Sequence, residues 1–150
     1  MRGGVLSLNG QGDFVELGTS FGNPASISLG GWINHTGTGR AEIISINDGV
    51  QLTVDEDGGL RASNSVNFAF RQELVSDEPI SGNGWHHVFY VVDSDSDTQA
   101  LYVDGRIVES GALVNDIVYS GATTTYLGTC LLYTSPSPRD QRGSRMPSSA

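Results

Sequence analysis

Two short acidic segments hold the side chains that are best suited to binding a metal ion. Asp93, Asp95 and Asp97 alternate with serines, and calcium takes about six to eight oxygen ligands, commonly from flexible loops. The segment lacks the glycine and the bidentate glutamate of an EF-hand loop, so the alternative is a hairpin turn whose Asp and Ser side chains bond to their own backbone. The acidic run Asp55–Asp57 has the same two interpretations. Calcium at Asp93, Asp95 and Asp97 is the candidate cofactor site, and the turn interpretation is favoured.

The other ionisable residues do not predict catalysis or zinc binding. Retaining hydrolysis of a glycoside needs two carboxylates about 5–5.5 Å apart that face one cleft, and the spacing Glu-x-Asp-x-x-Glu does not occur in the sequence. His86 and His87 are adjacent on a predicted strand, so their side chains point to opposite faces and cannot chelate one ion together. We therefore expect a protein that is not an enzyme, with structural, hydrogen-bonded histidines.

Aromatic residues offer a second kind of binding chemistry. Trp32, Tyr90 and Tyr102 could form a platform on which a sugar ring stacks. The alternative is that Trp32 and Trp85 fill the core, where such side chains bury most area, and this alternative is favoured for both. Tyr90 and Tyr102 alternate with aliphatic neighbours, so we expect either to reach solvent or an open sheet face.

Charge excludes two classes of partner. Residues 1–129 contain five arginines, no lysine and sixteen acidic residues, a net charge of −11. Binding to a nucleic acid backbone needs a basic patch, so neither nucleic acid nor an anionic membrane is an expected partner. No apolar run approaches the roughly 18 residues of a membrane helix, and membrane insertion is not expected.

Short alternating segments must position these residues. Two apolar runs around Asn9–Gly12 predict a first hairpin over Val5–Leu8 and Asp13–Leu17. Trp85–Val92 is apolar at both parities, which is typical of a strand covered on both sides, and Asp104-Gly105 predicts a tight hairpin turn. Further strands are predicted at Ala25–Ile33, Ala41–Ile46, Val50–Asp55, Leu60–Ala62, Val66–Phe70, Ala100–Val103, Arg106–Glu109, Ile117–Tyr119 and Thr124–Leu127. Ten or eleven short strands predict an all-β sandwich or barrel.

The order of these segments resembles the laminin G-like branch of the concanavalin A-like lectin/glucanase sandwiches. The match is carried by VLSLNGQGDFVELG (5–18), SISLGGWINHTGTG (26–39), DGVQLTVDEDGGLRAS (48–63), GNGWHHVFYVVDSDSDTQALYVDGRIVESG (82–111) and TTTYLGT (123–129). The resemblance implies a two-sheet antiparallel jelly-roll β-sandwich. It also implies that domains of this kind often hold one Ca²⁺ at a rim of the sandwich.

The resemblance also implies a function. It predicts a non-catalytic binding or adhesion module of a secreted or surface-attached multidomain protein, with a glycan or an extracellular protein as its ligand. The implied location is extracellular or at the cell surface, and the other implied partners are further domains of the parent chain. The alternative is an accessory or structural domain of a glycoside hydrolase or protease. In either role the contacts are expected from rim loops on a rigid scaffold.

The last residues differ from the rest of the chain. Cys130–Ala150 resembles the translation of a sequencing-adaptor oligonucleotide, and the segment is rich in Ser and Pro. We therefore expect a single, incomplete domain over 1–129 and a non-native, disordered tail over 130–150; a native Ser/Pro linker is the alternative. Members of the family continue with a closing strand beside an early strand. Its absence would leave an unpaired sheet edge that favours aggregation.

Overall fold

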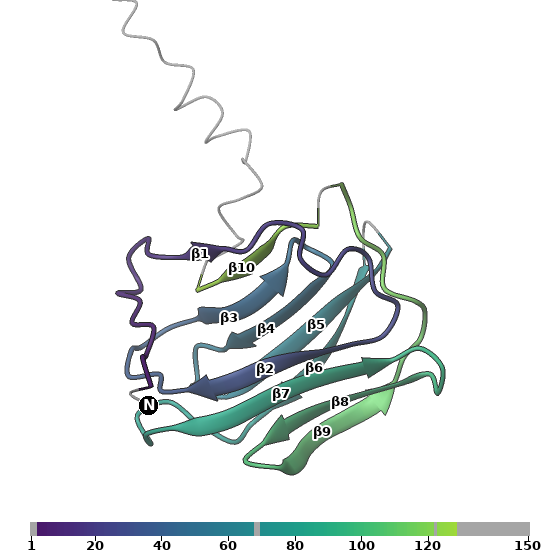
Figure 1. The fold of residues 1–150 in the computed structure, drawn as a ribbon. Helices are drawn as coiled ribbons and strands as arrows, with labels where there is room; N and C mark the ends of the chain where they lie inside the picture. Colours follow the sequence, from purple (N-terminus) through teal and green to yellow (C-terminus); the bar gives the residue numbers. More distant parts are fainter. Residues whose placement is uncertain (1–2, 68–69, 122, 129–150) are drawn as a thin grey trace, which may run out of the picture.

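The computed structural model describes residues 3–67, 70–121 and 123–128. These residues form ten strands and no helix, and Figure 1 shows the strands as two layers. None of the described elements is therefore a helix that could span a membrane. The strands are β1 (Val15–Glu16), β2 (Ile27–Ile33), β3 (Ala41–Ile46), β4 (Val50–Val54), β5 (Leu60–Asn67), β6 (Phe70–Ser76), β7 (His86–Asp93), β8 (Thr98–Val103), β9 (Arg106–Ala112) and β10 (Thr125–Leu127).

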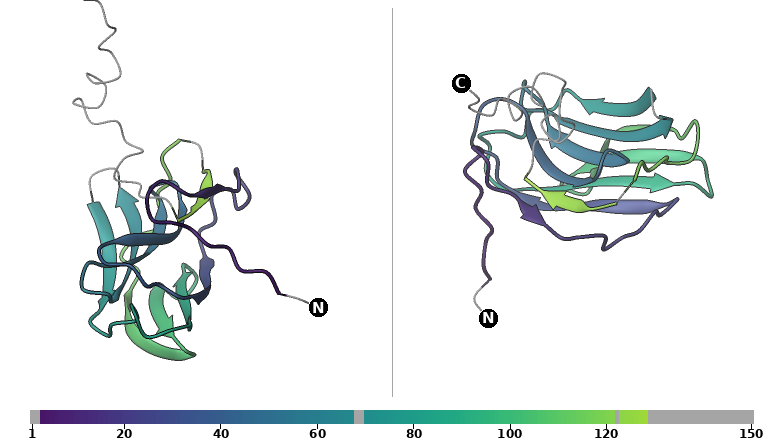
Figure 2. Two further views of the ribbon diagram at one scale, coloured as in Figure 1. Left: turned by 90° about the vertical axis from the view of Figure 1, so that its left-hand side faces the viewer. Right: turned by 90° about the horizontal axis from the view of Figure 1, so that it is seen from above.

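Both layers are antiparallel sheets. The six-stranded sheet has the order β1-β10-β3-β4-β5-β6, and the four-stranded sheet has the order β2-β7-β8-β9. The chain therefore passes from one sheet to the other after β1, after β2, after β6 and after β9, and Figure 2 shows the sheets stacked face to face. The predicted fold class, a two-sheet antiparallel jelly-roll β-sandwich, is confirmed.

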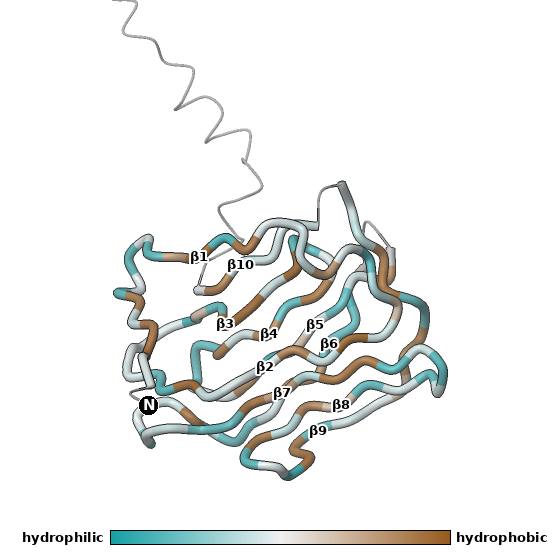
Figure 3. The backbone as a smooth tube through the Cα atoms, in the orientation of Figure 1, coloured by the Kyte–Doolittle hydropathy of each residue, from teal (hydrophilic) through white to brown (hydrophobic). Residues whose placement is uncertain are grey.

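The core lies between the sheets and follows from alternation along the strands. Every second residue of β4, β5, β7 and β8 faces the other sheet, because successive side chains of a strand point to opposite faces. Figure 3 shows hydrophobic segments along the strands of both layers. Each fully buried aliphatic side chain contributes roughly 1.5–3 kcal/mol. The fully buried members include Ile46, Val50, Leu52, Val54, Leu60, Ala62, Val88, Val92 and Leu101.

The pattern of β7 differs from the prediction. The segment is apolar at both parities, but only Val88, Tyr90 and Val92 are buried, whereas His87, Phe89 and Val91 are half-buried. The expectation that this strand is covered on both sides is therefore wrong within the described residues. The apolar residues of the second parity instead form part of the outer face of the four-stranded sheet.

The β8–β9 hairpin has the predicted turn. Asp104 and Gly105 both have positive φ angles, 50° and 78°, as a type I′ turn requires. The Asp104 carboxylate accepts hydrogen bonds from the His87 backbone N–H (2.9 Å) and lies 2.8 Å from His86 Nδ1. These contacts fix the turn against the start of β7.

The predicted N-terminal hairpin is wrong. Val5–Leu8 forms no strand, and Val5 and Leu6 are exposed. Val15–Glu16 pairs with β10 rather than with its neighbour in sequence, with Val15 opposite Leu127. The intervening segment is closed locally, since Asn9 Oδ1 accepts the Gln11 N–H at 2.7 Å. The long-range ladder to β10 thus replaces the local one.

Two other predicted strands also differ. The predicted strand Val66–Phe70 is divided between β5, which extends to Asn67, and β6, which begins at Phe70. Ile117–Tyr119 is not a strand, although the Val118 N–H donates to the Ser65 carbonyl.

Two predictions about the C-terminal region remain untested. The domain boundary at 129 and the tail 130–150 lie outside the described residues. Within the described part of the chain, β2 pairs with β7 and forms one edge of the four-stranded sheet.

Candidate functional site

The outer face of the four-stranded sheet carries a group of aromatic side chains. The strand register places Phe89 opposite Tyr102, and Tyr102 opposite Ile107, so these residues form one row across β7, β8 and β9. Trp32 on β2 is opposite His87 in the next row. We call this group the aromatic face; its members are Trp32, His87, Phe89, Tyr102 and Ile107.

Ring contacts join three members of the aromatic face. The ring centroids of Trp32 and His87 are 5.1 Å apart, with an angle of 52° between the ring planes. Those of His87 and Phe89 are 4.9 Å apart, with an angle of 41°. These distances lie within the range of favourable aromatic pairs. Trp32 nevertheless remains 65% exposed, and Ile107 is also exposed. A ligand can therefore reach ordered aromatic surface without any rearrangement of the sheet.

Gly30 is required for this arrangement. It faces Phe89 in the ladder between β2 and β7. A Cβ atom at Gly30 would lie 2.0 Å from the Val88 carbonyl oxygen and 2.8 Å from Phe89 Cδ2. Because real Cβ atoms do not approach other atoms so closely, only glycine allows β2 to lie against the Phe89 ring.

The structure corrects three of the aromatic assignments. Trp32 and Trp85 do not fill the core, since they are 65% and 49% exposed. Tyr90 does not reach solvent: it has the parity of Val88 and Val92 and is fully buried between the sheets. Tyr102 lies on an outer face, as predicted. His87, Phe89 and Ile107 were not predicted, although the second apolar parity of β7 was the signal that could have revealed them.

Tyr90 belongs to a buried polar group. Its hydroxyl donates to Gln99 Oε1 and accepts from Asn64 Nδ2, both at 2.7 Å. Burial, only partly opposed by the hydrogen bond from Asn64, raises the pKa of Tyr90 to about 12. This group fixes the two sheets against each other and is not available to a ligand.

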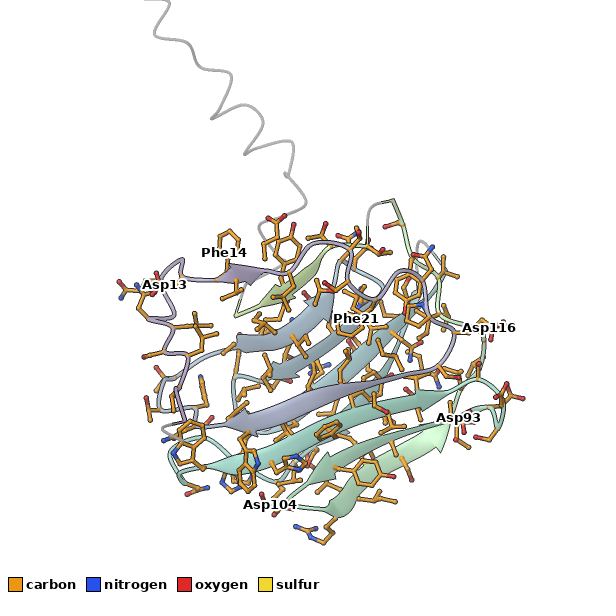
Figure 4. All side chains as sticks on the ribbon, viewed as in Figure 1. Asp13, Phe14, Phe21, Asp93, Asp104 and Asp116 are labelled. Atoms are coloured by element: carbon orange, nitrogen blue, oxygen red, sulfur yellow. The ribbon has the colours of Figure 1, made fainter. Side chains whose placement is uncertain are left out.

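The Asp93–Asp97 segment is a turn in which the first carboxylate is already engaged. Asp93 Oδ2 accepts the Ser96 hydroxyl at 2.7 Å and Asp93 Oδ1 accepts the Asp95 N–H at 3.0 Å. These bonds, that of Ser96 first, lower the pKa of Asp93. Figure 4 shows Asp93 and Asp104 at opposite ends of the four-stranded sheet. Among the described residues, no three His, Cys, Asp or Glu side chains lie together so that they could hold a metal ion. Calcium at Asp93, Asp95 and Asp97 stays a prediction.

The Asp55–Asp57 run also forms a turn. Asp57 Oδ1 accepts the Gly59 N–H at 3.0 Å, and Asp55 Oδ2 accepts Arg61 Nε at 2.8 Å. Burial alone would raise the pKa of Asp55, but the hydrogen bond and charge of Arg61 outweigh it and lower the pKa. Arg61 also binds Glu73 at 2.6 Å. A general acid needs a raised pKa, and Asp55 has the opposite shift.

The histidines are packed and bonded. His86 Nδ1 lies 2.8 Å from Asp104 Oδ2, and His35 Nδ1 lies 2.6 Å from Ser81 Oγ. His87 contacts Trp32 and Phe89 through its ring. The prediction of structural, hydrogen-bonded histidines is confirmed for His86 and His35, whereas His87 is part of the aromatic face.

Fold and sequence together define the family. The chain belongs to the concanavalin A-like lectin/glucanases superfamily, whose laminin G-type model matches residues 9–130. No curated protein sequence matches the chain.

Solved structures of the same fold include three distant relatives. A Bacteroides ovatus protein with a proposed carbohydrate-binding role is 15% identical, with a TM-score of 0.61 over 76% of this chain and 34% of that one. The CBM40 module of the Ruminococcus gnavus IT-sialidase, bound to α2,3-sialyllactose, is 14% identical, with a TM-score of 0.59 over 71% and 64%. Domains LG4-5 of the mouse laminin α1 chain are 16% identical, with a TM-score of 0.61 over 76% and 31%. The chain thus spans less than two thirds of the length of each relative. At these sequence identities the similarity shows that the fold is shared.

Proposed function

We propose that this chain is a non-catalytic module that binds carbohydrate on the aromatic face. The observation that carries the proposal is the exposure of Trp32 (65%) together with its ring contact to His87, which orders an aromatic side chain at the surface. The face of an aromatic ring is electron-rich, so it attracts the weakly positive C–H groups on the flat side of a pyranose ring. Exposed apolar patches on soluble proteins commonly mark ligand or partner sites.

Binding rather than catalysis is supported by the relatives and by the acidic residues. The Ruminococcus module is bound to a trisaccharide, and the Bacteroides protein has a proposed carbohydrate-binding role. In this chain Asp55 and Glu73 share Arg61, which favours two ionised carboxylates over the acid and base of a glycosidase. Fold alone does not assign a function, so the aromatic face is the part of the molecule to test.

The wider setting follows from the same proposal. Laminin G-type and carbohydrate-binding domains are typically extracellular or attached to a surface. Since the chain spans 34% of the Bacteroides protein and 31% of the laminin fragment, we propose that it acts beside other domains of a longer secreted or surface protein. An extracellular protein ligand would use the same aromatic face, because Ile107 adds exposed aliphatic surface to it.

A glycan array read with the wild-type chain and with Trp32→Ala tests the proposal. We expect neutral glycans to be retained by the wild type and lost by the variant. The matched control is Val114→Ala, because Val114 is exposed but lies in the segment after β9. Retention of the same glycans by Trp32→Ala at unchanged affinity would refute the role of the aromatic face.

A further inference from the structure

The outer face of the six-stranded sheet and its margin carry most of the arginines of the acidic segment 1–129, together with carboxylates. Three of the five arginines in residues 1–129 are at or beside this face: Arg61 on β5, Arg71 on β6, and Arg40 directly before β3. The register places Ser63 opposite Glu73, and both share a face with Arg61 and Arg71. This face lies on the side of the sandwich opposite to the aromatic face (Figure 2).

The arginines of the described chain differ in how their charge is compensated. Arg61 is paired with two carboxylates, those of Asp55 and Glu73, and Arg106 is paired with Glu78. Arg71 forms no ion pair with any carboxylate in the part of the chain that the structure describes. It donates hydrogen bonds to neutral acceptors, Ser63 Oγ and the Asp48 carbonyl, which orient the guanidinium, while the carboxylates of Asp48 and Glu73 act on its charge without forming an ion pair with it.

The hydrogen bonds of Arg71 leave a defined set of donors. Nε and Nη2 donate to Ser63 Oγ at 3.3 and 3.0 Å, and Nη1 donates to the Asp48 carbonyl. A guanidinium has five N–H groups, so one N–H on each terminal nitrogen remains without a partner among the described residues. Two such donors are what a carboxylate accepts in a bidentate pair.

The Asp48 carboxylate, whose charge acts on Arg71, is hydrogen-bonded to another residue. Both oxygens of the Asp48 carboxylate accept the Ser120 hydroxyl, at 2.7 and 2.8 Å. Burial lowers the pKa of Arg71, and the charges of Asp48 and Glu73 oppose that shift only partly, while the charge of Arg40 adds to it. The positive charge of Arg71 is thus held in place, partly desolvated and incompletely balanced.

We propose that Arg71 is a second ligand site that binds the carboxylate of an acidic sugar, a uronic or a sialic acid. The choice of a sugar rests on the proposed function, whereas the choice of a carboxylate rests on the Arg71 donors. Arg40 supplies a second positive charge near the bound anion.

The charge of the whole chain limits the size of the ligand. A net charge of −9 repels polyanions, so the site is suited to a single acidic sugar at the end of a glycan. A highly sulfated polymer such as heparin should bind less well than a short glycan with one carboxylate.

Calorimetric titration with α2,3-sialyllactose, a glucuronic acid-terminated disaccharide and lactose tests the inference. We expect at least one acidic sugar to bind more tightly than lactose. Arg71→Gln should weaken that binding at least about tenfold, because a charge-assisted bidentate pair is lost. Arg71→Lys keeps the positive charge but cannot form a bidentate pair, so it should weaken the binding to an intermediate degree. Arg106→Gln, at a paired arginine on β9, is the matched control and should change nothing.

The outcomes separate this inference from the proposed function. Loss of acidic-sugar binding in Arg71→Gln, with neutral glycans still bound through Trp32, supports both. Equal affinity of the wild type and Arg71→Lys, or no preference for acidic sugars over lactose, overturns the Arg71 site and leaves the aromatic face untouched. Acidic-sugar binding that depends on Arg71 but not on Trp32 supports this inference even if the aromatic face binds nothing. Equal melting temperatures of the Arg71 variants and the wild type would exclude misfolding as the cause of a loss.

Discussion

Removal of the Tyr90 hydroxyl tests the buried polar group that joins the two sheets. Tyr90→Phe removes two hydrogen bonds of 2.7 Å, one to Gln99 and one from Asn64. The contact between Asn64 Nδ2 and Gln99 Oε1, at 3.1 Å, remains, so the Gln99 oxygen keeps a partner and only one N–H of Asn64 is left unsatisfied. A buried donor without a partner costs about 1–3 kcal/mol. We therefore expect the free energy of unfolding of Tyr90→Phe to be about 1–2 kcal/mol lower than that of the wild type.

The matched control is Tyr102→Phe. Tyr102 has the same chemistry but lies half-buried on the outer face, where a substitution usually changes stability by less than about 0.5 kcal/mol. Urea unfolding of both variants and the wild type gives the two differences directly. Equal effects of the two substitutions, or a Tyr90→Phe variant as stable as the wild type, would refute the placement of Tyr90 between the sheets.

Three further predictions concern the aromatic face and the turns at the two ends of the four-stranded sheet. Gly30→Ala should lower the free energy of unfolding by about 1–3 kcal/mol through overpacking. The control is Gly31→Ala, which should change it little because a Cβ there meets nothing within 4 Å. Equal melting temperatures of the two variants would contradict the close approach of β2 to Phe89. Hydrogen bonds from the His87 N–H and from His86 lower the pKa of Asp104, so the stability that its charge adds is present above the unfolded pKa of about 3.9 and lost as the pH falls further. The difference in the free energy of unfolding between the wild type and Asp104→Asn, measured by urea unfolding, should therefore shrink below about pH 4. A constant difference down to about pH 2 would contradict a stabilising role of the Asp104 charge. Since the Asp93 carboxylate is bonded within its own turn, Ca²⁺ should not raise the melting temperature; a rise that grows with Ca²⁺ concentration would instead support the calcium site.

The class of fold could be predicted because its determinants are local. Alternation of apolar residues identifies strands, and Asp104-Gly105 identifies a type I′ turn. The N-terminal hairpin was wrong for the converse reason: Val15 pairs with Leu127, and a strand of two residues has no local signal that distinguishes a distant partner from a near one.

The side of the sheet on which an aromatic residue lies was harder to predict. Trp32 and Tyr90 are both large and are both on strands of the four-stranded sheet, yet one is exposed and the other is buried. In β7 both parities are apolar, so the pattern cannot tell which one faces the other sheet. The choice depends on the six-stranded sheet, where Asn64 offers Tyr90 a hydrogen-bond partner from a distant strand. Arg71 is similar, because the absence of an ion pair between it and a carboxylate of the described residues depends on which acids the fold brings near it.

The most direct test of the central claim uses Trp32 as its own reporter. The chain contains two tryptophans, so Trp85→Phe leaves Trp32 as the only one. Titration of this variant with a neutral glycan that the array identifies should produce a saturable change in tryptophan fluorescence and should protect Trp32 from acrylamide quenching. If calorimetry detects binding while the fluorescence of Trp32 and its quenching by acrylamide remain unchanged, the ligand binds elsewhere and the assignment of the aromatic face is wrong.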